Sequence, residues 1–452
     1  MGANPGESAI KAMLEREEHF FTQRNPKSED LSRRTARNWL RGVPMHWMVD
    51  WGMPFPLFVA SAVGVDVTDA DGHAYVDFCL GDTGAMFGHS PPPVVAALQR
   101  EGAHGFTTMM PSPDAAVVGD LLERAFGLPV WQVTATASDA NRSILRWARA
   151  VTGRRKILVF NHAYHGAVDE TFVSLENGRP VADPALIGEV RDLTSLTRVV
   201  EFNDPAALDA ALADGDVACV LAEPIMTNVG MVLPQPGFLD HLRAATEKTG
   251  TLLILDETHC ISSGPGGYTG AHGLKPDGLV MGKPLAGGIP AAVYGLSAAF
   301  ADRVNDFLKT RTPGHSGIGT TLSGSRIQLA LMRAVLENYF TDKAYAPLIA
   351  LAKKLEKGIA QVLIKHGLPW HVTRAGARVE FMCVATPPKN GGEAARVIHQ
   401  PLDEAIHHYL LNRGVIITPF HNMMLICPST TEAHVNRLLT VLDHCVAELR
   451  NS

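Results

Sequence analysis

Two charged residues stand at the ends of apolar runs, where burial makes a charge expensive. TLLILDE brings such a run to Asp256, and GLVMGKPLAGGIP brings the next to Lys283, which a loop with Gly287 and Gly288 follows. A carboxylate at a buried strand end needs a cationic partner, and a desolvated lysine readily forms a Schiff base with an aldehyde. The pair therefore suits pyridoxal phosphate (PLP), whose aldehyde the lysine holds and whose ring nitrogen the carboxylate keeps protonated.

Each residue has a plainer interpretation when it is taken alone. Strand-end aspartates commonly cap a following helix or loop, and a lysine at a strand edge extends its ammonium group into water. These alternatives explain one residue at a time and leave the combination unexplained. The pair, in this order along the chain, favours cofactor chemistry.

The residues between about 130 and 300 carry the pattern that would position such a pair. Short β-branched and apolar runs alternate with amphipathic helical stretches, as in KILVFN, RVVEFN, VACVLAEP and TLLILDE. Continuous apolar strands separated by helices are typical of a mostly parallel α/β sheet with helices on both faces. In such sheets ligands bind at the carboxyl ends of the strands, where Asp256 and Lys283 are expected.

The flanking residues are predicted to form a smaller α+β domain. Residues 1–45 indicate a charged helical arm, and Asp-Gly within 69–72 between apolar runs predicts a hairpin. Further expected elements are a helix from the prolines at 91–93, long helices over 323–367, strands near 371–385 and 415–427, and helices near 401–412 and 431–450. The expected segments are an N-terminal arm with the hairpin (1–90), a large PLP-binding domain (91–325), and linking helices with a C-terminal small domain (326–452).

The composition is that of an ordinary globular protein. Of 452 residues 46% are hydrophobic and 19% are charged, and the formal net charge of -6 offers no basic field for nucleic acid or an anionic membrane. The N-terminus is charged, and no run reaches the roughly 18 apolar residues of a membrane span. The six cysteines are scattered without a CxxC pair, which indicates a reducing compartment and a cytoplasmic protein.

Several motifs resemble those of a known enzyme family and occur in its order. LLILDE and MGKPLAGGIP are similar to the DE(V) and GK-x-x-GGG elements of class III (ω-type) aminotransferases, and the likeness runs from about residue 43 to the last helix. The chain most resembles the glutamate-1-semialdehyde aminomutase-like enzymes and the β-phenylalanine aminotransferases. The resemblance implies the fold type I of PLP-dependent transferases, a homodimer, and Lys283 and Asp256 as catalytic residues.

Two motifs resemble the family's contacts to the cofactor phosphate. V-T-A-T-A-S-D-A-N at 133–141 is similar to F-T-N-S-G-T-E-A-N, which implies that Ala137 and Ser138 cradle the phosphate. The motif ends a strand and opens a helix, whose amides and dipole attract a dianion, although Ser138 also suits an ordinary N-cap. G-T-T-L-S-G-S-R at 319–326 resembles G-T-L-S-G-N-P, which implies that Thr321 reaches the cofactor across the dimer interface.

Other motifs resemble contacts to the cofactor ring. N-H-A-Y-H-G at 161–166 is similar to the family's YHG element, which implies that Tyr164 stacks on the ring. A-E-P-I-M-T-N-V-G at 222–230 resembles E-P-V-x-G-N-x-G, so that Glu223 supports the site and Asn228 lies near the 3′-oxygen. Thr258 stands where the family has valine and is expected on the second face of the ring.

Two further patterns suggest chemistry that we do not favour. His162 and His165 have a spacing that metal ligands use, but no thiol or third ligand accompanies them, so no metal is expected. GPGGYTG at 264–270 is rich in glycine, yet no helix is expected after it, and it is interpreted as a flexible loop rather than a dinucleotide fingerprint.

The substrate pocket is predicted from residues that the resemblance leaves without an anion clamp. Where aminomutase-like enzymes often have an arginine, G-V-P-M-H-W-M places Met48, and where β-phenylalanine aminotransferases have another, I-T-P-F-H-N places Phe420. Both residues also suit a plain core. The expected donor carries an apolar or aromatic group beside its amine rather than a carboxylate. Pocket candidates are His46, Trp47, Met48, Asp82, Thr83, His259 and Phe420.

The leading functional hypothesis is a PLP-dependent aminotransferase that works by a ping-pong mechanism. It moves an amino group from a primary amine to an oxo-acid, whose carboxylate needs a cation that the sequence does not identify. If an amino acid proves the better donor, Arg326 and Arg142 are the candidate cations for its carboxylate. An aminomutase or a racemase on the same scaffold is the first alternative, since only the fate of the proton and of the cofactor differs. A non-catalytic PLP-fold binding protein is the second, and the presence of Lys283, Asp256 and Tyr164 together speaks against it.

Overall fold

The computed structural model describes residues 4–312 and 316–451. The chain divides into two units. Unit 2 consists of residues 92–345 and 388–396, and unit 1 of the residues up to 91, 346–387 and those from 397 onward. The three expected segments, 1–90, 91–325 and 326–452, stay a prediction of the domain boundaries.

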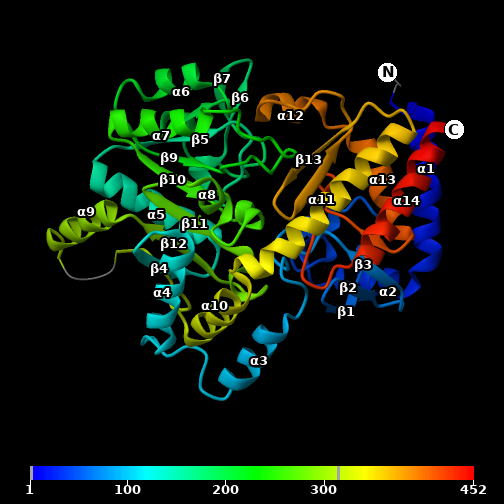
Figure 1. The fold of residues 1–452 in the computed structure, drawn as a ribbon, viewed down its shortest axis with the longest axis horizontal. Helices are drawn as coiled ribbons and strands as arrows, with labels where there is room; N and C mark the ends of the chain where they lie inside the picture. The colour runs from blue at the N-terminus through cyan, green and yellow to red at the C-terminus, as the bar shows by residue number, and fades with distance from the viewer. Residues whose placement is uncertain (1–3, 313–315, 452) are drawn as a thin grey trace. The chain divides into compact units, whose positions relative to one another are not determined.

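Unit 2 is built on a seven-stranded sheet, which Figure 1 shows in its cyan-to-green part. Neighbouring pairs are parallel except the two that β12 makes, with β11 and with β4. The predicted mostly parallel sheet is therefore confirmed. In spatial order the strands are β4 (Val130–Thr134), β12 (Ala292–Leu296), β11 (Gly278–Met281), β10 (Leu252–Asp256), β9 (Val217–Ala222), β5 (Lys156–Phe160) and β8 (Thr197–Val200).

Helices cover both faces of this sheet. Ile157 and Val159 of β5 belong to a core cluster with residues of α5 (Ala137–Thr152) and α9 (Ala298–Lys309). Side chains alternate along a strand, so Phe160 faces the other way, toward Phe202 and Phe238, with ring centroids 5.1 and 5.7 Å away. Phe238 begins α7 (Phe238–Thr249), which packs beside α6 (Pro205–Leu212). Burial on both faces explains why these strands are apolar throughout.

The strand directions bring the expected site residues to one edge of the sheet. Because β12 alone is reversed, the carboxyl ends of β4, β5, β9, β10 and β11 lie at the same edge. The loops that follow these five strands carry the cofactor motifs. The loop after β11 packs closely against α3 (Pro92–Glu101), because a Cβ at Gly287 would lie 2.6 Å from the side chain of Val94.

Unit 1 contains the helical arm, two small sheets and the C-terminal helices. The hairpin at 69–72 is confirmed, because β2 and β3 pair antiparallel and Gly72 takes a φ of 96°. The arm is anchored by Glu17, which accepts from Asn412 at 2.8 Å and Arg413 at 2.9 Å. Its elements are α1 (Glu7–Arg24), α2 (Pro26–Thr35), the sheet β1 (Val59–Val63), β2 (Asp66–Asp69), β3 (Ala74–Asp77) and β15 (Val415–Ile416), the sheet β13 (His371–Ala375), β14 (Arg378–Met382) and β16 (Met423–Leu425), and α13 (Gln400–Asn412) and α14 (Glu432–Asn451).

The long helices expected over 323–367 are present as α10 (Arg326–Tyr339) and α11 (Asp342–Lys365). The expected flexible loop at 264–270 is wrong in part, because α8 (Gly267–His272) begins inside it. The buried Glu257 carboxylate accepts from the amides of Tyr268 at 3.0 Å and Thr269 at 2.6 Å, and so binds the start of this helix from the loop after β10. Within the described residues, none of the helices has the length and apolar character needed to cross a membrane. The remaining elements are α4 (Asp114–Phe126), α12 (Gly391–Val397) and the hairpin of β6 (Val173–Glu176) and β7 (Arg179–Ala182).

Candidate active site

Asp256, the last residue of β10, is a buried carboxylate with three hydrogen-bond partners. Its Oδ2 accepts from Asn141 Nδ2 at 2.8 Å and faces His165 Nδ1 at 3.1 Å, and its Oδ1 accepts from the Thr258 amide at 3.1 Å. Burial raises the pKa of Asp256, but the hydrogen bond and electrostatic attraction of His165, together with the other donors, outweigh it and hold the pKa below its ordinary value. The carboxylate stays ionised, as a partner for a protonated ring nitrogen must.

The loop after β5 places His165 beside Asp256. His165 is 1% exposed and points Nδ1 at the carboxylate, while the backbone oxygen of His162 accepts from Asn228 Nδ2 at 3.3 Å. Across residues 4–312 and 316–451, no group of three or more His, Cys, Asp or Glu side chains could hold a metal ion.

The N-terminus of α5 forms a close cradle with the same loop. Thr136 is the N-cap and accepts from the Asp139 amide at 3.2 Å, so the interpretation of Ser138 as an N-cap is wrong. Ser138 Oγ instead accepts from the Ala167 amide at 3.0 Å, and a Cβ at Gly166 would lie 2.2 Å from it. The first amides of a helix, here those of Ala137 and Ser138, have no acceptor within the helix. This arrangement fits a phosphate.

The residues around Asp256 also fit the ring of PLP. Within the described ranges, Asn141 Oδ1, His165 Nε2 and Thr258 Oγ1 are buried and have no hydrogen-bond partner. An ionised carboxylate among such atoms, beside the α5 cradle, provides the donor and acceptor set that a pyridine ring with a phosphate arm requires. Both ends of the cofactor are therefore matched by residues of unit 2.

Lys283 follows β11 in a strained backbone conformation. Its φ of 52° lies in the left-handed region, which a residue with a side chain adopts at a cost of about 1 kcal/mol or more. The residue opens the short 3-10 turn Lys283–Ala286 and is half-buried. Such strain is retained where neighbouring structure fixes one side-chain direction, and Lys283 Nζ makes a close hydrogen bond to His259 Nε2.

His259 continues into a second polar group, formed with Thr227 and Glu223. Its Nδ1 lies 2.6 Å from Thr227 Oγ1, which donates to Glu223 Oε2 at 2.5 Å. Glu223 also accepts from the Tyr164 amide at 3.4 Å. Burial raises the pKa of Glu223 to about 7, against the opposing influence of His165 and Thr227. The sequence analysis predicted Glu223 as a residue that supports the cofactor site and His259 as a pocket candidate. It did not predict that Thr227 connects them.

The other expected cofactor residues take different positions. Tyr164 is 45% exposed at the carboxyl edge of the sheet, where its ring is accessible for stacking. Asn228 is exposed in the loop after β9. Thr321 is exposed in the turn at 321–324, and its expected reach into a partner subunit stays a prediction.

The expected pocket residues of unit 1 differ in burial. Met48 and Phe420 are 37% and 48% exposed, so the interpretation of either as a plain core residue is wrong. His46 and Trp47 lie beside Met48 in the exposed 3-10 turn His46–Val49. Thr83 is completely buried, and it follows Asp82 in a stretch where both residues have positive φ.

Arg378 of β14 is a residue that the sequence analysis missed. It is 1% exposed and donates from Nη2 to Thr83 Oγ1 at 2.5 Å, whereas Nε and Nη1 have no acceptor among the described residues. The two arginines considered earlier are engaged, Arg326 with Glu101 at 2.8 Å and Arg142 with the Ala167 oxygen at 2.9 Å. In RVEFM, charge alternates with apolar residues, which is the pattern of a strand with one face in water. Only the burial of that polar face reveals Arg378.

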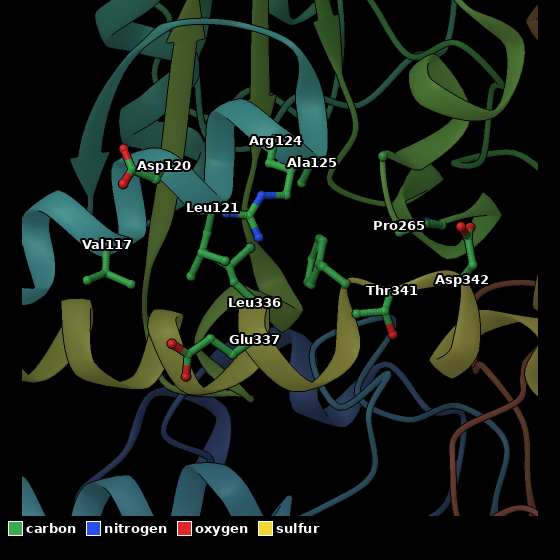
Figure 2. A pocket seen from close by; sticks show the side chains of 12 residues that line it. Val117, Asp120, Leu121, Arg124, Ala125, Pro265, Leu336, Glu337, Thr341 and Asp342 are labelled. Atoms are coloured by element: carbon green, nitrogen blue, oxygen red, sulfur yellow. The ribbon is translucent and has the colours of Figure 1, made fainter.

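A separate cavity of about 500 Å³ lies in unit 2 between α4 and α10. Figure 2 shows Arg124 of α4 and Glu337 of α10 at its walls, with Pro265 and Asp342 at one side. None of the expected catalytic, cofactor or substrate residues lines it. The carboxyl edge of the sheet, rather than this cavity, brings the expected groups together.

Comparisons with known proteins agree with this geometry. The family model of class-III aminotransferases matches residues 48–446. A glutamate-1-semialdehyde 2,1-aminomutase of Akkermansia muciniphila is 32% identical over 401 residues, 87% of this chain and 92% of that protein. A crystal structure of a glutamate-1-semialdehyde-aminomutase from Pseudomonas aeruginosa is 48% identical with a TM-score of 0.97, covering 99% of this chain and all of that one. A β-phenylalanine aminotransferase from Variovorax paradoxus shares the fold, with 24% identity and a TM-score of 0.86 over 97% of both chains.

The chain belongs to the class-III aminotransferase family, whose members use PLP, and it has the fold type I of PLP-dependent enzymes. The resemblance drawn from the sequence motifs is thereby confirmed at the level of family, fold and cofactor.

Proposed function

We propose that this class-III enzyme is an aminotransferase that moves an amino group from a primary amine without an adjacent carboxylate to an oxo-acid. The observation that supports it most is the meeting, at one sheet edge, of a strained lysine with a hydrogen-bonded histidine and an ionised, fully paired aspartate. When bound, PLP supplies an aldehyde that condenses with amines and a ring that withdraws electrons from the neighbouring carbon.

Lys283 is proposed to hold the cofactor and then to act as the base. With PLP bound, the free amine of Lys283 would remove the proton from the substrate carbon that bears the amino group. The left-handed backbone and the bond to His259 restrict the amine to a narrow set of positions. An amine that is already restricted loses less entropy when it reaches the reactive geometry, and this lowers the activation free energy.

Asp256 is proposed to keep the ring nitrogen protonated. A buried carboxylate whose pKa lies below its ordinary value favours a proton on its neighbour, and three partners prevent it from rotating away. The amides of Ala137 and Ser138 at the start of α5 are proposed to hold the phosphate, with Thr258 and Tyr164 at the ring, Asn228 near its 3′-oxygen and Glu223 supporting the site.

The substrate preference is proposed from the chemistry of unit 1. Met48 and Phe420 present accessible apolar surface, which favours an apolar or aromatic group beside the reacting amine. Arg378 offers two unused donors from a buried position and is the proposed cation for the carboxylate of the acceptor oxo-acid. Arg326 and Arg142 are already engaged and are poorer candidates.

An aminomutase is the second candidate, and the relatives favour it. Both the 32% identical protein from Akkermansia and the 48% identical structure from Pseudomonas carry the name glutamate-1-semialdehyde aminomutase. A mutase uses the same lysine and aspartate but returns the amino group within one molecule. The reaction balance therefore distinguishes the two, whereas the residues at the sheet edge do not.

The test is a panel of amines offered with pyruvate or 2-oxoglutarate, with both products measured. An aminotransferase forms one carbonyl product and one new amino acid for each donor consumed, and it forms neither when the oxo-acid is omitted beyond the first turnover. Conversion of glutamate-1-semialdehyde into its isomer, without any oxo-acid, would replace the proposal by the mutase. Racemisation of a single amino acid would replace it by a racemase.

The assembly and the location of the protein are proposed from the sequence motifs. A homodimer would let Thr321 reach the phosphate in the partner subunit, as the motif at 319–326 implies. A cytoplasmic location is inferred from the six cysteines, which are scattered without a CxxC pair. A dimeric mass in solution, with the Thr321→Ala variant binding PLP more weakly but dimerising normally, is the expected outcome.

A further inference from the structure

Four side chains from three neighbouring strand-end loops form one continuous series of hydrogen bonds. The loop after β9 supplies Glu223 and Thr227, the loop after β10 supplies His259, and Lys283 follows β11. Glu223 Oε2 lies 2.5 Å from Thr227 Oγ1, and Thr227 Oγ1 lies 2.6 Å from His259 Nδ1. His259 Nε2 then contacts Lys283 Nζ. Both His259 nitrogens are thus used, one toward each end.

The single hydroxyl proton of Thr227 sets the direction of the whole series. When Glu223 is ionised, Thr227 donates its proton to the carboxylate, and its oxygen must then accept from His259 Nδ1–H. The neutral imidazole is left with its lone pair on Nε2. That lone pair faces Lys283 Nζ, so it accepts a proton of the lysine ammonium.

Protonation of Glu223 reverses every bond in the series. The carboxyl group then donates to Thr227 Oγ1, Thr227 donates to His259 Nδ1, and His259 Nε2–H donates to the lone pair of a neutral Lys283 amine. Between the two states one proton has left the ammonium group and one has arrived on Glu223. Each intermediate group gains one proton and loses another, so the charges of Thr227 and His259 do not change.

Burial raises the proton affinity of the Glu223 end of the series above that of an ordinary carboxyl group. Glu223 is 4% exposed, and desolvation raises its pKa to about 7, opposed by His165 and Thr227 and reinforced by the charge of Asp256. A carboxyl group of ordinary acidity would not take a proton from an amine at neutral pH. Glu223 is able to receive one because of where it is buried.

Thr227 is required because Glu223 and His259 do not bond directly. His259 Nδ1 lies 3.9 Å from Glu223 Oε2, beyond hydrogen-bond distance. The motif at 222–230 resembles E-P-V-x-G-N-x-G, in which glycine stands where this chain has Thr227, so the hydroxyl is a feature of this sequence.

We propose that Thr227 and His259 carry a proton between Lys283 and Glu223, so that the lysine amine is deprotonated inside the protein rather than by solvent. In this role Glu223 stores the proton, and Thr227 and His259 are positioning residues that act through Lys283. The proposal rests on Lys283 being the reacting amine of the proposed function.

The test uses the apoprotein and the variants Thr227→Val, Thr227→Ser and His259→Gln, and it measures the rate at which trinitrobenzenesulfonate labels Lys283 at neutral pH. Valine has nearly the shape of threonine but no proton to pass on, so we expect labelling to slow about tenfold or more. Serine restores the hydroxyl and should label within about twofold of the natural protein. Glutamine can contact the lysine but cannot relay a proton, so it should behave like the valine variant.

A matched control and a second measurement complete the experiment. Thr246→Val removes another buried hydroxyl, one that bonds only to the backbone of α7, and it should leave labelling unchanged. Nitrogen-15 spectra should show the His259 proton on Nδ1 in the natural protein above neutral pH, and a changed tautomer balance in Thr227→Val. Equal labelling of the natural and Thr227→Val proteins would overturn the relay. Failure of Lys283 to react in every form, including the natural one, would instead contradict the proposed function.

Discussion

Two buried polar clusters of this protein differ in how many hydrogen-bond partners the chain provides for the charged group. At the sheet edge of unit 2, the Asp256 carboxylate has three partners, all supplied by the chain. On β14 of unit 1, the Arg378 guanidinium is 1% exposed and uses one donor only, toward Thr83. A buried charge that lacks partners costs several kcal/mol. The first cluster is therefore organised by the protein itself, and the second is suited to an anion that arrives with a substrate.

The neighbours of Arg378 sharpen this contrast. Glu380 lies two residues along the same strand, but its Oε1 bonds to His421 Nδ1 at 2.7 Å rather than to the guanidinium. Burial lowers the pKa of His421, but Glu380 outweighs that effect, and the pKa lies above its ordinary value. One oxygen of Glu380 is thus paired with His421, its Oε2 has no hydrogen-bond partner among the described residues, and neither oxygen bonds to Arg378.

The largest effect is expected when the lysine of the completed cluster is removed. Lys283→Ala should lower turnover by about ten-thousandfold, because both the bond to the cofactor and the base are lost. The fold should remain, and PLP should still bind weakly at the α5 cradle without its visible lysine-linked band. Borohydride reduction of the natural protein followed by peptide mapping provides the check. A label on any other lysine would remove the basis of the proposed function.

Asp256→Asn tests whether Asp256 acts through its negative charge or only through the space that its side chain fills. Asparagine fits the same space but cannot favour a proton on the ring nitrogen, so we expect a loss of about a thousandfold in kcat/KM, or about 4 kcal/mol. The cofactor should still bind, which absorbance measures directly. A variant within about tenfold of the natural rate, about 1.4 kcal/mol, would mean that Asp256 has a structural role.

The two clusters also differ in how far the sequence predicts them. Asp256 and Lys283 were recognisable because each ends an apolar run, and parallel strands necessarily bring such ends to one edge. The link through Thr227 was not recognisable, because it joins loops that only the sheet order makes adjacent. Arg378 was missed for a different reason, since the alternating pattern of β14 predicts a wet face and only tertiary packing buries it. The sequence thus indicates where charges are costly, while their partners depend on contacts between distant segments.

Glu257, whose carboxyl group accepts from the first amides of α8, is also buried, and its burial makes stability depend on pH. Burial raises the pKa of Glu257 to about 7, against the donors of Thr269 and Tyr268. The folded state therefore binds a proton that the unfolded state releases near its ordinary pKa of 4.5, so the contribution of Glu257 to stability falls as pH rises from about 5 to 7. Glu257→Gln should reduce this loss in the free energy of unfolding by about 2 kcal/mol. Tm measured across this range is the check, and Glu176→Gln, at the exposed end of β6, is the control.

Arg378→Met tests the incomplete cluster. Methionine removes a charge that the chain does not neutralise, so Tm in a buffer free of organic anions should stay the same or rise. The KM for the acceptor oxo-acid should rise at least tenfold, about 1.4 kcal/mol, while the KM for an apolar amine donor changes little. Arg326→Met, which breaks an ion pair with Glu101, is the comparison that should lower Tm instead. An unchanged KM for the oxo-acid would show that the carboxylate is bound elsewhere.

The smallest effect is expected for Met48→Arg. This substitution tests whether a cation can be added where related enzymes often have one. Met48 and Phe420 present apolar surface, so an aralkyl amine gains by burial where a carboxylate without a cation would lose its hydration. Met48 is 37% exposed, which weakens any new charge interaction through solvent screening. Met48→Arg should therefore shift preference toward the β-amino acid of the same skeleton by only a few-fold, about 1 kcal/mol. The measurement is the ratio of kcat/KM for the two donors in the natural and variant proteins. If the natural protein already prefers the amino acid, Arg378 must serve the donor as well as the acceptor, and the two half-reactions share one anion site.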